Sequence, residues 1–346
     1  MKLPHLTRTA RVCALAIAAA PCAAAAQSAP QVVTPANFVR AETDGYFAGA
    51  IARGGLGRFF PLRELASPER PLVIRPNRDT LYSTAVFDLD AGPVTIRLPE
   101  AGARYFSLMV INQDHYIPVI RHGAGTYRID RAAVGTRYAL VGLRIFVDPT
   151  REGDLAAVHQ LQDGVTVDQP GGPGRFEKPD WDADSQARVR RALLALGETL
   201  PNLDQAFGKA PNVNPVAHLV GAAMAWGGLP RAEATYLNVT PARNDGTTSY
   251  RLRVGKVPVD AFWSITVYNR DGGLIANPER KYSLNNLSAV PSADHSITVQ
   301  FGNCLPRQEN CLPVAPGWNY MVRLYRPRAE ILAGRWSFPA AAPITP

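Results

Sequence analysis

The sequence predicts a mainly β protein with two β-sandwich domains and a helical connector between them. Short segments of alternating or continuously apolar residues, separated by Gly, Pro and Asp turns, recur in the first and last thirds of the chain. Helical periodicity replaces this pattern in the middle. A chain of 346 residues is also long enough to bury two hydrophobic cores. We therefore expect an N-terminal sandwich over residues 27–150, a connector over 151–230 and a C-terminal sandwich over 231–346.

The first 26 residues have the features of a secretory signal peptide. Their basic residues precede an apolar run, residues 12–20, that is too short to cross a bilayer. Ala24 and Ala26 provide the small residues of a cleavage site, which would leave Gln27 as the new N-terminus. The sequence therefore predicts a periplasmic or secreted protein without a membrane span.

Charge and cysteine usage agree with export. The leader carries three basic residues and no acidic one, which leaves a formal charge of +5 from the +8 of the whole chain. The remaining charges are scattered, so no nucleic-acid partner is expected. Cys304 and Cys311 close a short loop, "CLPRQENC", and two such cysteines in an exported protein predict a disulfide. Since no His or further Cys lies close to them, we expect no metal site there.

The N-terminal region should begin with a helix over residues 34–53. Thr34 can cap it, Pro35 suits its first turn, and apolar residues recur at helical spacing. Two of the strands that follow are apolar on both faces and should be central and covered. These two are 105–112 and 138–147, and the full set covers 80–89, 94–98, 105–112, 127–129 and 138–147.

The connector should contain three helices, which begin near Asp154, Asp182 and Asn214. In the second of them, four apolar residues should form the buried face: Val189, Leu193, Leu194 and Leu196. Gly and Pro residues at 227–230 end the third. The C-terminal strands should cover 234–239, 249–254, 261–269, 296–302 and 319–327.

Longer segments form a pattern that covers nearly all of the chain after the leader. They include "NFVRAETDGYF" (37–47), "RPNRDTLYSTAVFDLDAGPVTIRLP" (75–99), "INQDHYIPVI" (111–120), "AWGGLPRAEATY" (225–236) and "VPVDAFWSITVYNRDG" (257–272). On them the chain resembles the bacterial exported proteins that pair domain of unknown function 1254 with domain of unknown function 1214. The resemblance implies two jelly-roll-like sandwiches and a helical element, and it implies no reaction. Gln113 and His295 depart from the pattern, which has an acidic residue and a turn glycine at these positions.

The stretch "NRDTLYS" gives the first candidate site. Arg78 and Asp79 could hold a substrate while Tyr82 donates a proton. Strand alternation puts Arg78 and Tyr82 on one face and Asp79, with Asn77, on the other. The alternative is a polar lock at the start of the strand, with Asp79 paired to a distant Arg or to backbone N–H groups.

The loop "NQDHY" gives the second candidate, because it follows a buried strand at the rim of the sheet. Asp114 and His115 could provide a general base, with Asn112 as a ligand-binding group. The alternative is a hydrogen-bonded structural histidine, since neighbours on a strand point to opposite faces.

In the C-terminal domain, Trp263, Tyr268 and Asn285 could bind a ligand through aromatic and amide groups. The alternative is that the aromatic side chains pack in the core, with one of them near a surface or interface.

Three functions remain open at this point. The first is binding of a small molecule or a cell-envelope glycan in a groove between the domains. The second is hydrolysis of an ester or glycosidic bond by Asp79, Tyr82, Asp114 and His115. The third is an oligomeric structural role, in which edge strands of the second domain supply an interface. We expect no cofactor, because the chain lacks the G-x-S-x-G, H-E-x-x-H, P-loop, G-x-G-x-x-G and four-ligand zinc patterns.

Overall fold

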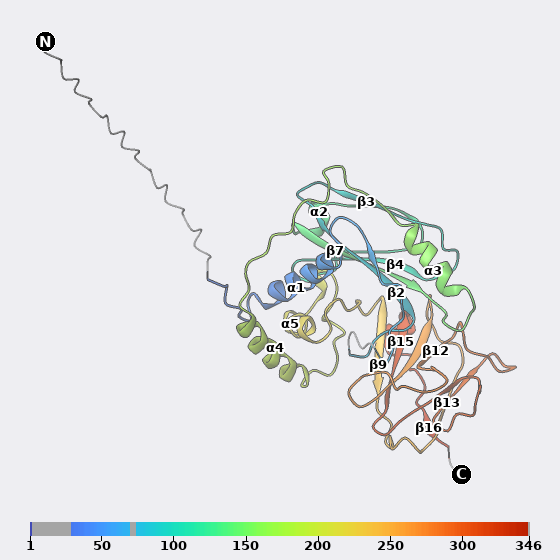
Figure 1. Cartoon of the computed structure of the whole chain (residues 1–346). Helices are drawn as coiled ribbons and strands as arrows, with labels where there is room; N and C mark the ends of the chain where they lie inside the picture. Colours follow the sequence, from blue (N-terminus) through green and yellow to red (C-terminus); the bar gives the residue numbers. More distant parts are fainter. Residues whose placement is uncertain (2–28, 70–73, 345–346) are drawn as a thin grey trace.

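The computed structural model confirms the predicted mainly β class, with sheets arranged as two sandwiches and few helices (Figure 1). It describes Met1, residues 29–69 and residues 74–344. The predicted signal peptide, apart from Met1, lies outside the described residues. Within the described part of the chain, no helix has the length and apolar character needed to cross a bilayer.

The first sandwich packs a five-stranded sheet against a three-stranded one. The strand order is β1-β2-β7-β4-β5 in the larger sheet and β6-β3-β8 in the smaller. Every residue of β4 is buried and β7 lies at the centre, as their two-sided apolar sequences predict. The bounds are β1 Phe60–Pro61, β2 Thr80–Asp88, β3 Val94–Leu98, β4 Phe106–Asn112, β5 Val119–His122, β6 Gly125–Ile129, β7 Tyr138–Phe146 and β8 Thr166–Asp168.

Two short helices also belong to this sandwich. They are α2 (Arg131–Val134) and α3 (Asp154–Asp163). Val158 of α3 lies in the core between the two sheets, and β8 pairs with β3. The first sandwich therefore extends into the region that the sequence assigned to the connector.

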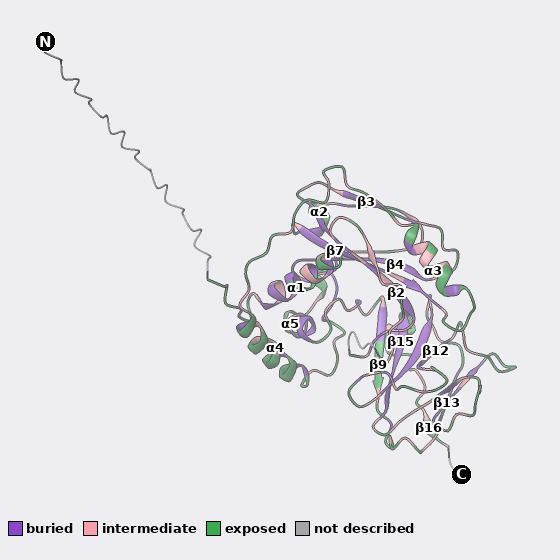
Figure 2. Ribbon diagram, viewed as in Figure 1, coloured by how far each residue is buried: buried purple, intermediate pink, exposed green. Residues whose placement is uncertain are grey.

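Three helices pack together: α1 (Phe38–Ala52), α4 (Ala183–Gly197) and α5 (Pro215–Met224). Helices α1 and α5 contact the outer face of the five-stranded sheet, and α4 packs on these two helices. Asp182 and Asn214 cap the last two by accepting hydrogen bonds from backbone N–H groups of the first turn. The predicted buried face of α4 is wrong in part. Leu193 is buried, whereas Leu194 and Leu196 are 39% and 42% exposed, because α4 turns only one narrow stripe towards α1 and α5 (Figure 2).

The second sandwich consists of two four-stranded sheets, ordered β14-β13-β10-β16 and β12-β11-β15-β9. The predicted disulfide between Cys304 and Cys311 is present. His295 lies in a turn with φ 64°, the left-handed conformation that favours glycine. The bounds are β9 Ala234–Val239, β10 Tyr250–Val254, β11 Trp263–Tyr268, β12 Ser283–Asn285, β13 Ile297–Phe301, β14 Cys311–Leu312, β15 Asn319–Tyr325 and β16 Ala342–Pro343, with the short helix α6 Ala329–Leu332. A further short helix, η1 Ala210–Asn212, lies between α4 and α5.

The five-stranded sheet, which we call the roof sheet, covers both the helices and the second sandwich with its outer face (Figure 1). At one end, Phe146 and Tyr105 of the first sandwich pack against Phe262 and Tyr325 of the second, with ring centroids 4.2–5.6 Å apart within this group. At the other end, Val86 and residues near it contact the helices. We call the first sandwich, the three helices and the second sandwich the three blocks of the fold. The middle of this sheet face lies where they meet.

Candidate functional site

The segment before β2 enters the interface between the two sandwiches. Arg75 has φ 51°, and its backbone N–H donates to the carbonyl of Gly272 in the second sandwich. Pro76 accepts a hydrogen bond from the Tyr268 hydroxyl at 2.9 Å. Asn77 donates to the hydroxyls of Tyr82 and Tyr325 at 2.9 and 3.0 Å. The polar stretch therefore joins domains as well as starting a strand.

Asp79 is the most deeply buried member of this interface, with 1% of its surface exposed. One carboxylate oxygen accepts from the hydroxyls of Ser264 (2.6 Å) and Tyr325 (3.4 Å), and the other has no hydrogen-bond partner among the described residues. Burial raises the pKa of Asp79, and the positive charge of Arg323 opposes that rise. We call this set the domain lock: Arg75, Pro76, Asn77 and Asp79 with Ser264, Tyr268, Arg323 and Tyr325.

The expected pairing of Arg78 with Tyr82 is wrong. Strand β2 begins only at Thr80, so residues 75–79 lie before it, and the first of them, Arg75, has a left-handed backbone. The side chains of this segment therefore do not alternate as those of a strand do. Arg78 therefore lies over the ring of Tyr282, 4.7 Å from its centroid, and donates to the carbonyl of Ala66. Tyr82 instead lies beside Asn77, which the alternation had placed on the opposite face.

The "NQDHY" loop separates its candidate residues. Asn112 holds the turn by accepting from the N–H groups of Asp114 and Tyr116. Asp114 is half-exposed and pairs with Arg40, whose Nε lies 3.0 Å away. His115 is fully buried, and its Nε2 accepts from the backbone N–H of Gly227 at 2.9 Å. Asp114 and His115 therefore point to different partners.

His115 is the central ring of an aromatic stack. Trp226 and His218 lie on its two sides, with ring centroids 5.2 and 5.4 Å away. Tyr46 and Tyr116 extend the stack outwards. Burial, and next to it the neighbouring His218, lowers the pKa of His115 to about 3. A histidine that stays neutral in this setting orients Gly227 rather than exchanging protons.

The candidates in the second sandwich lie on both sides of one sheet. Trp263 is in the core between the sheets and lines a small pocket of about 290 Å³ at its edge. Tyr268 is fully buried on the outer face, where it belongs to the domain lock. Asn285 accepts from the N–H groups of Leu287 and Ser288 and so holds a turn.

Four polar side chains form a continuous row across the roof sheet. Tyr82 on β2 lies opposite Arg144 on β7, which lies opposite Ser107 on β4, which in turn lies opposite His122 on β5. Directly opposed side chains in antiparallel strands have Cβ atoms about 4.5–5.5 Å apart. We call these four residues the polar row, and only Tyr82 had been predicted from the sequence. The available signal was Arg144, the single charged residue in the apolar strand "YALVGLRIFV".

Solvent-accessible space remains next to the polar row. Tyr82, Thr84 and Arg144 are only half-buried, although they lie on inner strands of a face that other blocks cover. A Cβ added to Gly142, on the same face, would have no atom within 4 Å. Gly227 accepts from the Arg144 guanidinium at 3.1 Å. We call this space the junction hollow, bounded by Tyr82, Thr84, Gly142 and Arg144 on the sheet and by Gly227 and Tyr236 on the covering segments.

Polar atoms without partners gather beside this hollow. The hydroxyls of Tyr105 and Ser107 and the Nδ1 of His122 are buried and have no hydrogen-bond partner among the described residues. The Nε2 of His122 lies 2.7 Å from the carboxylate of Glu233. Buried polar groups are nearly always paired in folded proteins. Burial raises the pKa of Tyr105, and the hydroxyl of Ser107 lies close enough to oppose that rise, so the Nδ1 of His122 is the atom here that most clearly lacks a partner. Within the described residues, no three His, Cys, Asp or Glu side chains gather as metal ligands do.

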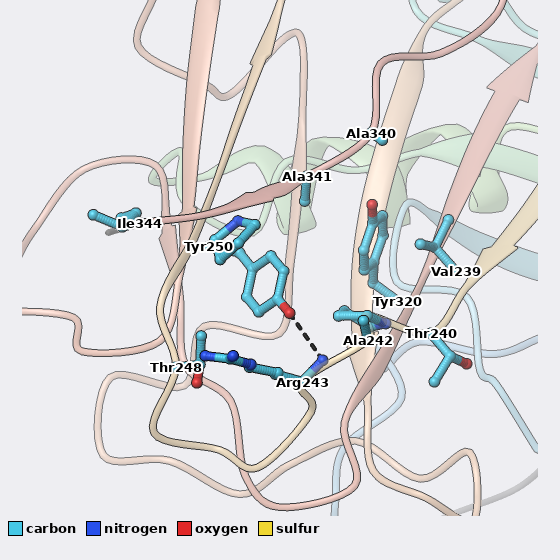
Figure 3. A pocket seen from close by; sticks show the side chains of 12 residues that line it. Val239, Thr240, Ala242, Arg243, Thr248, Tyr250, Tyr320, Ala340, Ala341 and Ile344 are labelled. Atoms are coloured by element: carbon cyan, nitrogen blue, oxygen red, sulfur yellow. Dashed lines mark hydrogen bonds between the residues drawn. The ribbon is translucent and has the colours of Figure 1, made fainter. Parts of the chain in front are cut away.

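A separate pocket of about 510 Å³ lies on the second sandwich, between the end of β9 and the C-terminal segment (Figure 3). Its lining is mostly apolar. Tyr250 points its hydroxyl at the backbone N–H of Arg243, which donates to it at 3.0 Å. None of the residues predicted from the sequence lines it, and it contains no histidine or carboxylate. The junction hollow therefore has more charged and titratable groups beside it than this pocket.

The fold and the hollow define a class: a two-domain β protein with a polar site where its sandwiches and helices meet. Residues 56–169 match the family described as "Protein of unknown function (DUF1254)", and residues 234–329 match "Protein of unknown function (DUF1214)". Both domains are therefore present in the chain, in the order that the sequence resemblance predicts.

Two solved structures share the fold. The VPA0106 protein from Vibrio parahaemolyticus is 17% identical with a TM-score of 0.69, and the match covers 89% of this chain and 96% of that one. An uncharacterized protein from Burkholderia cenocepacia is 13% identical with a TM-score of 0.51, over 89% and 86% of the two chains. No curated protein matches the sequence.

Proposed function

We propose that this protein binds a small molecule in the junction hollow, outside the cytoplasm. The observation that carries the proposal is the space kept open over Gly142 beside half-buried Tyr82 and Arg144. Residues on the covered face of a central strand normally pack against neighbours and leave few voids. Rigid sheet positions also hold their side chains more precisely than loops do, which suits ligand binding. The disulfide supports an oxidising compartment such as the periplasm.

The hydroxyls and rings around the hollow suit a ligand with both polar and apolar parts. Tyr82 and Tyr236 present aromatic faces with hydroxyl tips, and Thr84 adds a further hydroxyl. Pockets for small molecules characteristically combine apolar walls with a few fixed polar groups. A fragment of an envelope glycan or a small metabolite would satisfy this description.

Filling the hollow tests the proposal. Gly142→Val adds a β-branched side chain to a strand position with free space and ordinary backbone angles, so the variant should fold. We expect compounds that raise the melting temperature of the wild-type protein to lose this effect in the variant. Gly45→Ala is the control, because Gly45 also has free space around it but lies at an exposed position of α1. Ligands that bind both variants equally would place the site elsewhere.

Hydrolysis is the second candidate, and the His122–Glu233 pair favours it. An acid that orients a histidine opposite a serine resembles the arrangement used for nucleophilic attack. Ser107 Oγ is nevertheless buried, so a substrate could not reach it without a movement of the covering side chains. Of the residues predicted as catalytic, only Tyr82 borders this place.

A panel of chromogenic esters and glycosides tests the hydrolase. Hydrolysis by the wild-type protein that is lost in Ser107→Ala would favour it. Asp114→Asn is the control, because Asp114 lies away from the hollow and pairs with Arg40. Equal turnover in the wild type and Ser107→Ala would exclude Ser107 as the nucleophile.

A further inference from the structure

We infer that the ligand of the junction hollow is a small organic anion whose carboxylate is bound by Arg144. The inference rests on the proposed function, because it specifies the chemical class of ligand at the same site. It starts from a cation that the protein itself does not neutralise.

Arg144 forms no ion pair with any described residue. Its guanidinium donates to the carbonyl of Gly227 and to the sulfur of Met109, at 3.1 and 3.7 Å, and lies 5.4 Å from the ring centroid of Tyr82. A guanidinium has five N–H donors in a fixed planar arrangement. Donors therefore remain for a bidentate partner, and a carboxylate matches their geometry.

Three other covered arginines of this protein pair with carboxylates. Arg104 binds Asp154, Arg137 binds Asp88, and Arg190 binds Glu42. In each pair the acidic side chain is no more than 4% exposed. Buried charges are expected to be paired in this way. Among the described residues, Arg323 is likewise without a carboxylate, but its guanidinium donates to Thr266, Tyr268 and the Arg75 carbonyl, whereas Arg144 lies beside the free space over Gly142.

The neighbours of Arg144 are neutral groups that can donate hydrogen bonds. The ring of Tyr82 lies beside its guanidinium, and the phenols of Tyr105 and Tyr236 interact with it electrostatically. Burial raises the pKa of Tyr105, so this phenol keeps its proton. Glu233, a nearby acid, is held by His122 at 2.7 Å. Hydrogen-bond donors and the unpaired guanidinium of Arg144 thus converge on the hollow, which favours an anion.

A single carboxylate fits better than a phosphate. One guanidinium balances one negative charge, whereas phosphate sites usually add further cations or a helix N-terminus. The floor next to Arg144 consists of Gly142, Thr84 and Met109, which are directly opposed on β7, β2 and β4. This surface is uncharged and can contact the organic part of the ligand.

Matched pairs of carboxylates and amides test the charge requirement. Acetate, benzoate and 4-hydroxybenzoate would be compared with acetamide, benzamide and 4-hydroxybenzamide by isothermal titration calorimetry. We expect at least one carboxylate to bind, and its amide to bind about tenfold more weakly or worse. Arg144→Met should remove this preference, and Arg144→Lys should retain part of it. Circular dichroism would establish that both variants fold.

The outcomes separate this inference from the proposed function. If amides bind as well as carboxylates, and Gly142→Val blocks both while Arg144→Met blocks neither, the hollow binds ligands but the carboxylate assignment is wrong. If carboxylates bind wild type, Gly142→Val and Arg144→Met equally, both proposals fall. If no carboxylate in the panel binds at millimolar concentration, the anion assignment is overturned.

Discussion

A carboxylate sealed between two domains, as Asp79 is, depends on every hydrogen bond it receives. Replacing Asp79 by Ala should lower the free energy of unfolding by about 1–3 kcal/mol, because the hydroxyls of Ser264 and Tyr325 would lose an acceptor in a buried setting. Asp79→Asn should cost less, since its amide oxygen can still accept. Urea denaturation at neutral pH measures both.

Asp114→Asn provides the contrast for this prediction. Asp114 pairs with Arg40 in a half-exposed position, where ion pairs contribute about 0–1 kcal/mol. If Asp79→Ala destabilised the protein no more than Asp114→Asn, the domain lock would not be a major source of stability.

His115 should make the protein sensitive to acid. The unfolded chain binds a proton at this histidine near its ordinary pKa of 6.5, whereas burial holds the folded pKa at about 3. Stability from His115 is therefore fully present above pH 6.5 and falls as the pH decreases towards 3, by up to about 1.4 kcal/mol per pH unit.

The variant His115→Gln should show a shallower loss of stability between pH 7 and pH 5 than the wild type, since its amide oxygen can still accept from Gly227 and does not titrate. Urea unfolding at several pH values gives the two slopes. His295→Gln, at an exposed turn position, is the matched control. Identical slopes in wild type and His115→Gln would contradict the predicted burial of a neutral ring.

At the scale of elements, the loop between β13 and β14 depends on its disulfide. Cys311 lies on β14, which pairs in parallel with β13, and Cys304 lies in the loop that joins them. A closed loop of this length stabilises the folded state by about 2.5 kcal/mol in the chain-entropy estimate. The double variant with both cysteines replaced by Ser should lose about that much in urea denaturation. Thiol labelling of the folded wild type without reductant should find neither cysteine free.

Elements with two-sided apolar sequences were the most predictable part of the fold. Both predicted central strands, β4 and β7, occupy the positions expected, because a strand that is mostly apolar on both faces is covered from both sides. The buried face of α4 was less predictable. Periodicity selects a broad apolar stripe, whereas the contact with α1 and α5 uses only the part that includes Leu193.

The polar row could not be predicted, because the sequence of a single strand does not determine its register with the neighbouring strands. Ser107 and Arg144 are 37 positions apart in the chain and meet only through the pairing of β4 with β7. Single-strand alternation was misleading even locally, since β2 begins at Thr80 and Arg78 does not share its alternation. A charged residue inside an apolar strand, as at Arg144, was the one local sign of the site.

At the scale of the whole molecule, one sheet belongs to the first sandwich and also contacts the helices and the second sandwich. The roof sheet buries its inner face in the first sandwich, and its outer face contacts the helices at one end and the second sandwich at the other. Gly227, in the segment that follows α5, is bonded twice to the first sandwich, because its N–H donates to His115 and its carbonyl accepts from Arg144. The junction hollow is thus held by the mutual placement of the blocks, and weakening their interface should also weaken ligand binding.

The domain lock should make the two sandwiches unfold together. Ser264 and Tyr325 are the hydroxyl groups through which the second sandwich reaches Asp79, and Tyr325 also accepts from Asn77. The double variant Ser264→Ala/Tyr325→Phe removes these hydroxyls and keeps the packing of the Tyr325 ring against Phe262. We expect differential scanning calorimetry to show one transition for the wild type and two for the variant, because intra-domain cores remain while the coupling is lost.

The double variant Thr298→Ala/Tyr250→Phe, which alters a strand pair remote from the lock, should unfold in one transition at a lower temperature. A single transition in the lock variant would show that apolar contacts alone couple the domains.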